Sequence, residues 1–151
     1  LGLEVQEVEG LTEVDFGEWE GRPLTELARE PLWKVVQVAP SRARFPGGES
    51  VTEMQVRSVA AVEAIAERHV GEAAVVVAHA DVIKAVVAQS IGMHLDHYQR
   101  LSVAPASCSM LTLTPFGVLL GGFGAPASLE IALAQSSKPS GPAGSALAER
   151  A

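Results

Sequence analysis

The stretch Ala73–Lys84, AAVVVAHADVIK, contains the strongest fold signal in the chain. Residues 73–78 form a continuous apolar run, which is typical of a β-strand covered on both faces. Helical spacing follows up to Ile91, and we expect Asp81 to be the N-cap of that helix and Gly92 to follow its end. His79 then lies at the carboxyl end of the strand, where open α/β sheets bind their ligands.

Composition limits the classes of function. A chain of 151 residues with 48% hydrophobic residues can form one domain with a core. The net charge of −7 argues against nucleic acid as a partner, since Lys and Arg must neutralise its phosphates. It leaves room for a small anionic ligand, because a pocket can gather a few cations. No apolar stretch is long enough to predict a transmembrane helix.

The single cysteine, Cys108, excludes a disulfide within the chain. It lies in the apolar run SCSMLTL, and we expect a buried structural thiol there. Disulfides are rare in a reducing compartment. We therefore expect the protein in the cytoplasm.

Turn and cap signals predict further elements. We expect a short strand at Leu3–Val8 and a helix from Pro23 to about Val36, with the proline in its first turn. Ser50 and Glu53 form the capping box S-x-x-E, which predicts a helix up to His69.

The last part of the chain predicts a hairpin and a tail. Two strands, Ser107–Thr114 and Val118–Phe123, are expected to pair antiparallel. From Gln135 the composition changes to SSKPSGPAGSA, which is typical of disorder. We therefore expect one domain over residues 1–134 and a disordered tail over 135–151.

Two side chains are candidates for chemistry. Glu13 lies in LTEVDFGEWEGR, close to Phe16 and Trp19, and a carboxyl beside apolar groups can keep the proton that a general acid needs. His79 precedes a helix N-terminus, whose amides and dipole favour an anion. The alternatives are a solvated acidic loop for Glu13 and a hydrogen-bonded structural role for His79.

No metal or cofactor is expected. His94 and His97 lie three residues apart, but no acidic or cysteine residue is spaced with them as zinc ligands are. Arg42 and Arg44 lie in the loop before FPGG. Such arginines are more often solvated loop charges.

Three motifs in this order, LTEVDFGEWEG, FPGGES and VVVAHADVIK, resemble the histidine phosphatase superfamily, also called the phosphoglycerate mutase-like family. The resemblance extends from Leu3 to about Gly121. It implies an α/β fold, a three-layer α/β/α sandwich with a mostly parallel sheet, and a phospho-histidine mechanism without metal. The family's nucleophile lies in an R-H-G motif on the first strand. No such triplet occurs in this chain, so the resemblance implies a longer protein with the nucleophile upstream of Leu1.

The resemblance also implies roles for individual residues. Glu13 matches the family's proton donor, and His79 matches the second histidine, which stabilises the transferring phosphoryl group. Ala80 stands where the family usually has glycine, and we expect it to be tolerated unless the position needs a positive φ. Arg42 and Arg44 lie in the region that borders the substrate entrance in the family, so they are candidates for recognising a second anionic group.

The expected activity is that of a phosphatase acting on a small phosphorylated metabolite. Pro46 follows Glu13 by 33 positions, without the longer basic insertion of the mutases. A phosphoglycerate-type mutase is the second interpretation, and a truncated, non-catalytic binding module is the third. The chain alone is expected to be inactive, and a homo-oligomer remains open.

Overall fold

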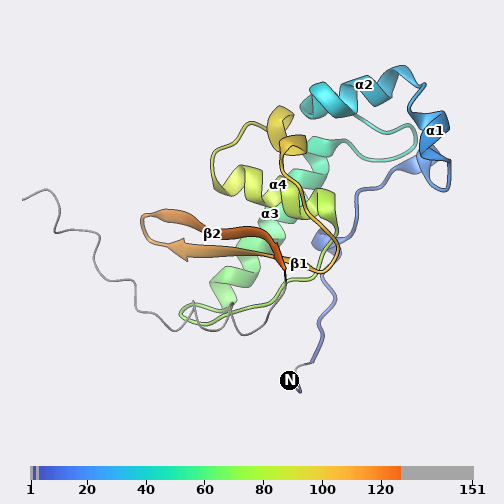
Figure 1. Ribbon diagram of the computed structural model, residues 1–151. Coiled ribbons are helices and arrows are strands. Elements are labelled where there is room, and N and C mark those ends of the chain that lie inside the picture. Colours follow the sequence, from blue (N-terminus) through green and yellow to red (C-terminus); the bar gives the residue numbers. More distant parts are fainter. Residues whose placement is uncertain (1, 3, 127–151) are drawn as a thin grey trace, which may run out of the picture.

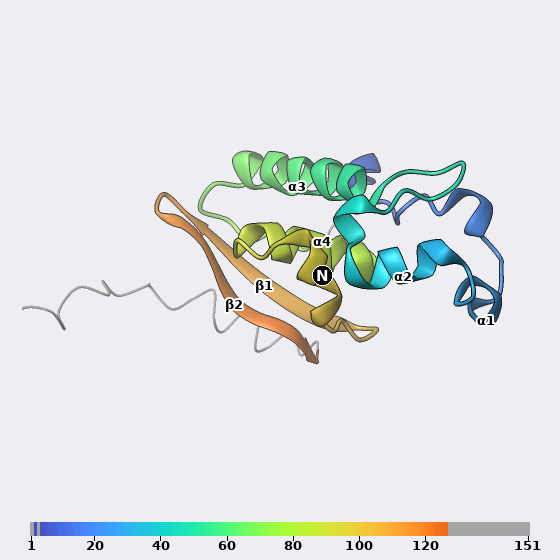
Figure 2. The same cartoon turned by 90° about the horizontal axis from the view of Figure 1, so that it is seen from above.

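Two helices and a β-hairpin carry most of the architecture in the computed structural model, which describes residues 2 and 4–126. Helix α4 (Ala80–Ser90) lies between α3 (Val51–Arg68) and the hairpin of β1 (Ser107–Thr114) and β2 (Gly117–Pro126) (Figures 1 and 2). The expected tail and the boundary at residue 134 lie outside the described residues.

Short elements lie at the end of the molecule away from the hairpin turn (Figure 2). They are α1 (Leu24–Leu27) and α2 (Pro31–Val38). Within residues 4–126, four 3-10 turns complete the order: Glu9–Leu11, Gly17–Trp19, Pro40–Arg42 and Leu95–Arg100. Within the described part of the chain, no helix has the length and apolar character needed to cross a membrane.

The capping box at the start of α3 is confirmed. The Ser50 hydroxyl accepts a hydrogen bond from the Glu53 amide at 3.1 Å, and the Glu53 carboxylate accepts one from the Ser50 amide at 2.8 Å. This reciprocal pair satisfies two amides that the first helical turn would otherwise leave free. The buried side chains of α3 include Val51 and Met54. The start of α3 is therefore fixed by local sequence and by core packing.

The single helix expected from Pro23 to Val36 is wrong, because the structure has α1 and α2 with a break between them. Pro31 begins α2, and Glu30 before it is extended with a ψ of 139°. Proline lacks an amide hydrogen and pushes the preceding residue out of the helical region. Pro31 therefore ends one helical segment and starts the next.

The N-cap of α4 is His79 and not Asp81, so that prediction is corrected. Asp81 lies within the first turn, where its carboxylate pairs with the Lys84 ammonium at 2.6 Å. Gly92 follows the end of the helix with a φ of +69°, as expected. The first turn of α4 consequently has no side-chain cap on its amides.

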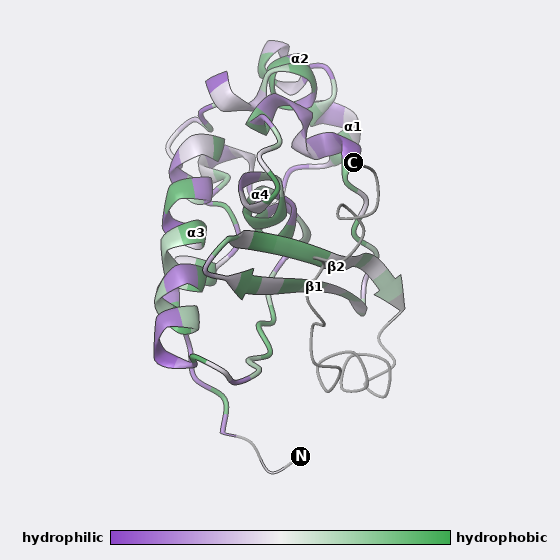
Figure 3. Cartoon of the chain, turned by 90° about the vertical axis from the view of Figure 1, so that its left-hand side faces the viewer, coloured by the Kyte–Doolittle hydropathy of each residue, from purple (hydrophilic) through white to green (hydrophobic). Residues whose placement is uncertain are grey.

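The hairpin is confirmed, with β1 and β2 paired antiparallel and Leu111 opposite Leu120. Among the described residues it is the only sheet, so the expected mostly parallel sheet is not found in that part of the chain. The strand expected at Leu3–Val8 is not formed over residues 4–8. Figure 3 shows hydrophobic residues along the hairpin. Some of them face solvent, since Leu119 is 60% exposed.

The apolar run at residues 73–78 is a loop between α3 and α4, which corrects the predicted strand (Figure 1). Val75 and Val77 are 76% and 89% exposed, and within the described residues the backbone of this run has no hydrogen bond. A strand exists only when a neighbour pairs with its amides and carbonyls. No described segment supplies that neighbour.

We therefore predict that residues 1–151 alone do not form a stable monomer. Burying one Val side chain contributes about 1.5–3 kcal/mol, so the exposed Val75 and Val77 together forfeit about 3–6 kcal/mol, which is comparable with the lower part of the margin of about 5–15 kcal/mol of a whole domain. Sedimentation should show association, or denaturant should give a broad, non-cooperative transition. A sharp cooperative transition from a monomer would contradict this expectation.

An aromatic cluster forms the core beneath the acidic motif. Phe45 is 3% exposed and packs edge to face against Phe16 and Trp19, with ring centroids 5.0 and 5.3 Å apart. Such geometry suits the quadrupoles of the rings.

Cys108 is exposed, which corrects the prediction of a buried thiol. No described element covers its side of β1.

Candidate active site

Backbone contacts lock the acidic motif to the FPGGES motif. The Glu18 amide donates to the Pro46 carbonyl at 2.8 Å, and the Glu49 amide donates to the Asp15 carbonyl at 3.1 Å. Gly17 has a φ of +53°, and a Cβ there would lie 2.3 Å from the Pro46 oxygen. Only glycine accommodates both this conformation and this approach. The two motifs are thus held together by backbone hydrogen bonds and close packing.

Glu13 and His79 come together although 66 positions separate them. Their side chains face each other, with 3.5 Å between Glu13 Oε2 and His79 Nδ1. Glu13 Oε1 accepts a hydrogen bond from the Val14 amide at 3.0 Å. The side chains are 33% and 59% exposed, so a ligand can reach both. The structure therefore places the predicted acid beside the predicted phosphoryl-binding histidine.

The start of α4 adds hydrogen-bond donors at this point. His79 is extended, with a ψ of 162°, and the helix runs from Ala80. Uncapped amides of a first turn favour an anion. Ala80 is not among the described residues with a positive φ, so its backbone does not require glycine. The predicted tolerance at this position is consistent with the helical geometry.

Tyr98 is buried close to the carboxylates of Asp81 and Glu13. Burial raises the pKa of its hydroxyl, and the charges of Asp81 and Glu13 raise it further. Lys84 lies 5.0 Å from the Tyr98 ring centroid and pairs with Asp81. The ammonium of Lys84 is consequently engaged within the fold and is not directed to a ligand.

The two predicted substrate arginines lie in different settings. Arg44 pairs with Glu53, and the hydrogen bonds from Arg44 and Ser50 lower the pKa of Glu53 to about 2. Arg42 is exposed at the end of a 3-10 turn. Among the hydrogen bonds and ion pairs of the described residues, neither arginine contacts Glu13 or His79. Arg42 therefore remains the freer of the two for binding a ligand.

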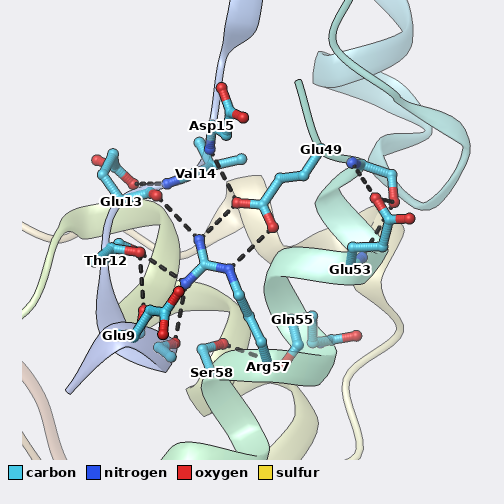
Figure 4. A network of polar contacts seen from close by, with 12 residues as sticks. Glu9, Thr12, Glu13, Val14, Asp15, Glu49, Glu53, Gln55, Arg57 and Ser58 are labelled. Carbon is cyan, nitrogen blue, oxygen red and sulfur yellow. Dashed lines mark hydrogen bonds and ion pairs between the residues drawn. The ribbon is translucent and has the colours of Figure 1, made fainter. Parts of the chain in front are cut away.

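Two functional candidates were missed at the sequence level, namely Arg57 and Glu49. Figure 4 shows Arg57 between the Glu49 carboxylate and the segment that carries Glu13. The sequence contained one signal: Arg57 follows the N-cap Ser50 by seven positions, or about two helical turns, and so lies on the same face. Nothing in the sequence indicated that the Glu13 segment would cross that face.

A shallow pocket of about 210 Å³ lies beside the start of α4. Its walls are Ala78, Ala80, Ile83 and residues 103–107, so small apolar groups dominate. A phosphate needs several donors or cations around it. The side chains that line this pocket offer no charged group to a phosphate. Over the described residues, no group of three or more His, Cys, Asp or Glu side chains is arranged to hold a metal ion.

We predict an acid-dependent loss of the Glu49 contribution to stability. Burial raises the pKa of Glu49, but hydrogen bonds from Arg57 and the Asp15 amide outweigh it, so the pKa is lowered on folding. A carboxyl with a lowered folded pKa stabilises the protein above its unfolded pKa of about 4.3, and this contribution is lost as the pH falls through the folded value.

The measurement compares the free energy of unfolding of the whole wild-type protein and its Glu49→Gln variant across pH. The wild-type advantage should be largest near neutral pH and should shrink below about pH 4. An advantage that stays constant down to about pH 2 would contradict the assignment.

Comparison with known proteins gives one family. The model of the histidine phosphatase superfamily (branch 1) matches residues 1–123. No curated protein sequence matches the chain significantly.

Solved structures of the same fold include YhfR of Bacillus stearothermophilus, with 25% identity and a TM-score of 0.74 over 80% of this chain and 61% of that one. A phosphoserine phosphatase from Entamoeba histolytica has 20% identity and a TM-score of 0.70, over 82% and 63%. A mycobacterial glucosyl-3-phosphoglycerate phosphatase has 23% identity and a TM-score of 0.69, over 83% and 67%. The chain thus spans about two thirds of the length of these proteins or slightly less.

Proposed function

The chain belongs to the histidine phosphatase superfamily, and on this basis we propose that the whole protein hydrolyses small phosphate monoesters through a phospho-histidine intermediate. The observation that carries the proposal is the 3.5 Å approach of Glu13 and His79 at the uncapped start of α4. The nucleophilic histidine would come from an R-H-G segment outside residues 1–151. The single cysteine supports a cytoplasmic location.

In the first step the nucleophilic nitrogen attacks phosphorus, a P–N bond forms and the P–O bond to the leaving group breaks. His79 and the first-turn amides of α4 stabilise the charge on the equatorial oxygens of the phosphoryl group. Glu13 gives its proton to the departing alkoxide, which leaves as an alcohol. Arg42, which is exposed at the end of a 3-10 turn, is the proposed contact for a further anionic group of the substrate.

In the second step water attacks the phosphorus and the P–N bond breaks. The Glu13 carboxylate, now deprotonated, accepts the proton of the attacking water, so the enzyme returns to its starting state. Inorganic phosphate is released. The proposed sequence of steps uses His79, Glu13 and the first-turn amides of α4 and includes no metal.

The phosphatase is favoured over a mutase by the short connection between the two motifs. Pro46 follows Glu13 by 33 positions, and the intervening elements, α1, α2 and two 3-10 turns, are small. The described part of the chain thus has no long basic cover that would retain a phosphorylated intermediate for a second transfer.

The test uses the whole protein, incubated with p-nitrophenyl phosphate, phosphoserine and 3-phosphoglycerate. Release of inorganic phosphate from a monoester, unaffected by a chelator, supports the proposal. Isomerisation of phosphoglycerate without phosphate release would indicate a mutase, and no turnover of any ester would indicate a binding module. Residues 1–151 alone should release no phosphate.

A further inference from the structure

We propose that Arg57, held by Glu49, is a positioning residue that keeps Glu13 aligned with His79. The inference rests on the proposed function, since it concerns the acid of that reaction. Arg57 lies on α3, and its guanidinium reaches across to the segment that carries Glu13 (Figure 4). It acts on the backbone of Glu13 and does not contact the substrate.

All five N–H groups of Arg57 are used within the fold. Nη2 donates to the Glu13 carbonyl at 3.0 Å, and Nη1 donates to the carbonyls of Gly10 and Thr12 at 3.0 and 2.9 Å. The other two bonds go to Glu49, from Nε at 2.9 Å and from Nη2 at 2.6 Å. No donor of Arg57 remains for a ligand, which excludes a direct phosphate contact.

Glu49 fixes the guanidinium and the segment together. One of its oxygens, Oε1, accepts from Arg57 and also from the Asp15 amide at 2.9 Å. Arg57 and Glu49 together form a clamp, which binds the chain on both sides of Glu13, at Thr12 and at Asp15. The hydrogen bonds that Arg57 donates to Glu49 raise the pKa of Arg57, so the guanidinium stays charged.

The position of Glu13 depends on this clamp because the segment itself is irregular. Residues 12–16 belong to no helix or strand. The 3.5 Å separation of Glu13 and His79 is sensitive to small shifts of the backbone, and misplacing a catalytic group by about 1 Å can cost about 10²-fold in rate. The planar fork of arginine is needed, since lysine cannot make bonds of this geometry.

The test compares the whole wild-type protein with its Arg57→Met, Arg57→Lys and Glu13→Gln variants and with the double variant. Each is assayed with an alkyl phosphate, whose leaving group needs a proton, and with p-nitrophenyl phosphate, whose leaving group hardly does. The readout is the ratio of the two kcat/KM values, which report the formation of the phosphoenzyme and not the later water attack that both substrates share. Met54→Ala is the matched control, because Met54 is fully buried on the same helix and a smaller side chain there lowers stability without touching Glu13.

We expect Arg57→Met to lower the alkyl-to-nitrophenyl ratio by about tenfold or more, with Arg57→Lys giving little rescue. In the Glu13→Gln background the same change should leave the ratio unaltered, since the two residues act through one group. Met54→Ala should leave the ratio at the wild-type value. Equal losses on both substrates, or a loss of ratio that persists without Glu13, would overturn the inference alone. A wild-type protein without phosphatase activity would overturn the proposed function as well.

Discussion

Replacing Glu13 by Gln in the whole protein should lower the turnover of alkyl phosphates by about 10²–10⁴, which is the usual contribution of a positioned acid. The amide keeps the size of the side chain and its contact with the Val14 amide, but it has no proton to give to the alkoxide. Because a nitrophenolate leaves without help, the loss should be much smaller with p-nitrophenyl phosphate in the step that forms the phosphoenzyme.

The matched control is Glu20→Gln. Glu20 is an exposed carboxylate of the same motif, and its removal changes the net charge by the same amount. We expect its turnover on both substrates to stay close to wild type. Equal losses of kcat/KM on both substrates in the Glu13 variant would show that Glu13 does not protonate the leaving group, because kcat/KM reports the step that forms the phosphoenzyme.

Replacing His79 by Ala should lower kcat by about 10²–10³, as the loss of one donor to a developing charge does in other enzymes. The melting temperature should change little. The His79 side chain is 59% exposed, and its one polar contact among the described residues is the 3.5 Å approach to Glu13.

The control for His79 is His97→Ala, at an exposed histidine of the last 3-10 turn. This variant should keep both its activity and its stability. A large fall in melting temperature for His79→Ala, with unchanged activity of the folded fraction, would assign His79 a structural role.

Local signals predicted local structure well. The capping box at Ser50 and the hairpin across Pro115–Gly117 depend on residues close in sequence, and both are confirmed. The break at Pro31 was available from the sequence too, since proline cannot continue a helix from its preceding turn. The prediction of one continuous helix across Pro31 gave too much weight to the apolar spacing on either side of the proline.

The strand predicted at residues 73–78 failed for a different reason. Its apolar character was read correctly, but a strand is defined by its neighbours, and the described chain has no partner for it. The same dependence on long-range contacts concealed Arg57. Its role arises because a segment more than forty positions away crosses the face of α3, which no local pattern indicates.

The approach of Glu13 to His79 lies between these cases. The two residues were selected from separate motifs, and the structure brings their side chains together. The roles of acid and phosphoryl-binding group stay predictions, because geometry gives proximity and not the direction of proton transfer.

The most direct test of the central claim is to trap the intermediate. The whole protein is mixed with a phosphate-labelled p-nitrophenyl ester, quenched in base within one turnover, and digested to locate the label. The account predicts phosphate on a histidine outside residues 1–151, stable in base and lost in acid, and accumulating further in Glu13→Gln because water attack then lacks its base. Label on His79, on a serine or cysteine, or no covalent label during active turnover would contradict it.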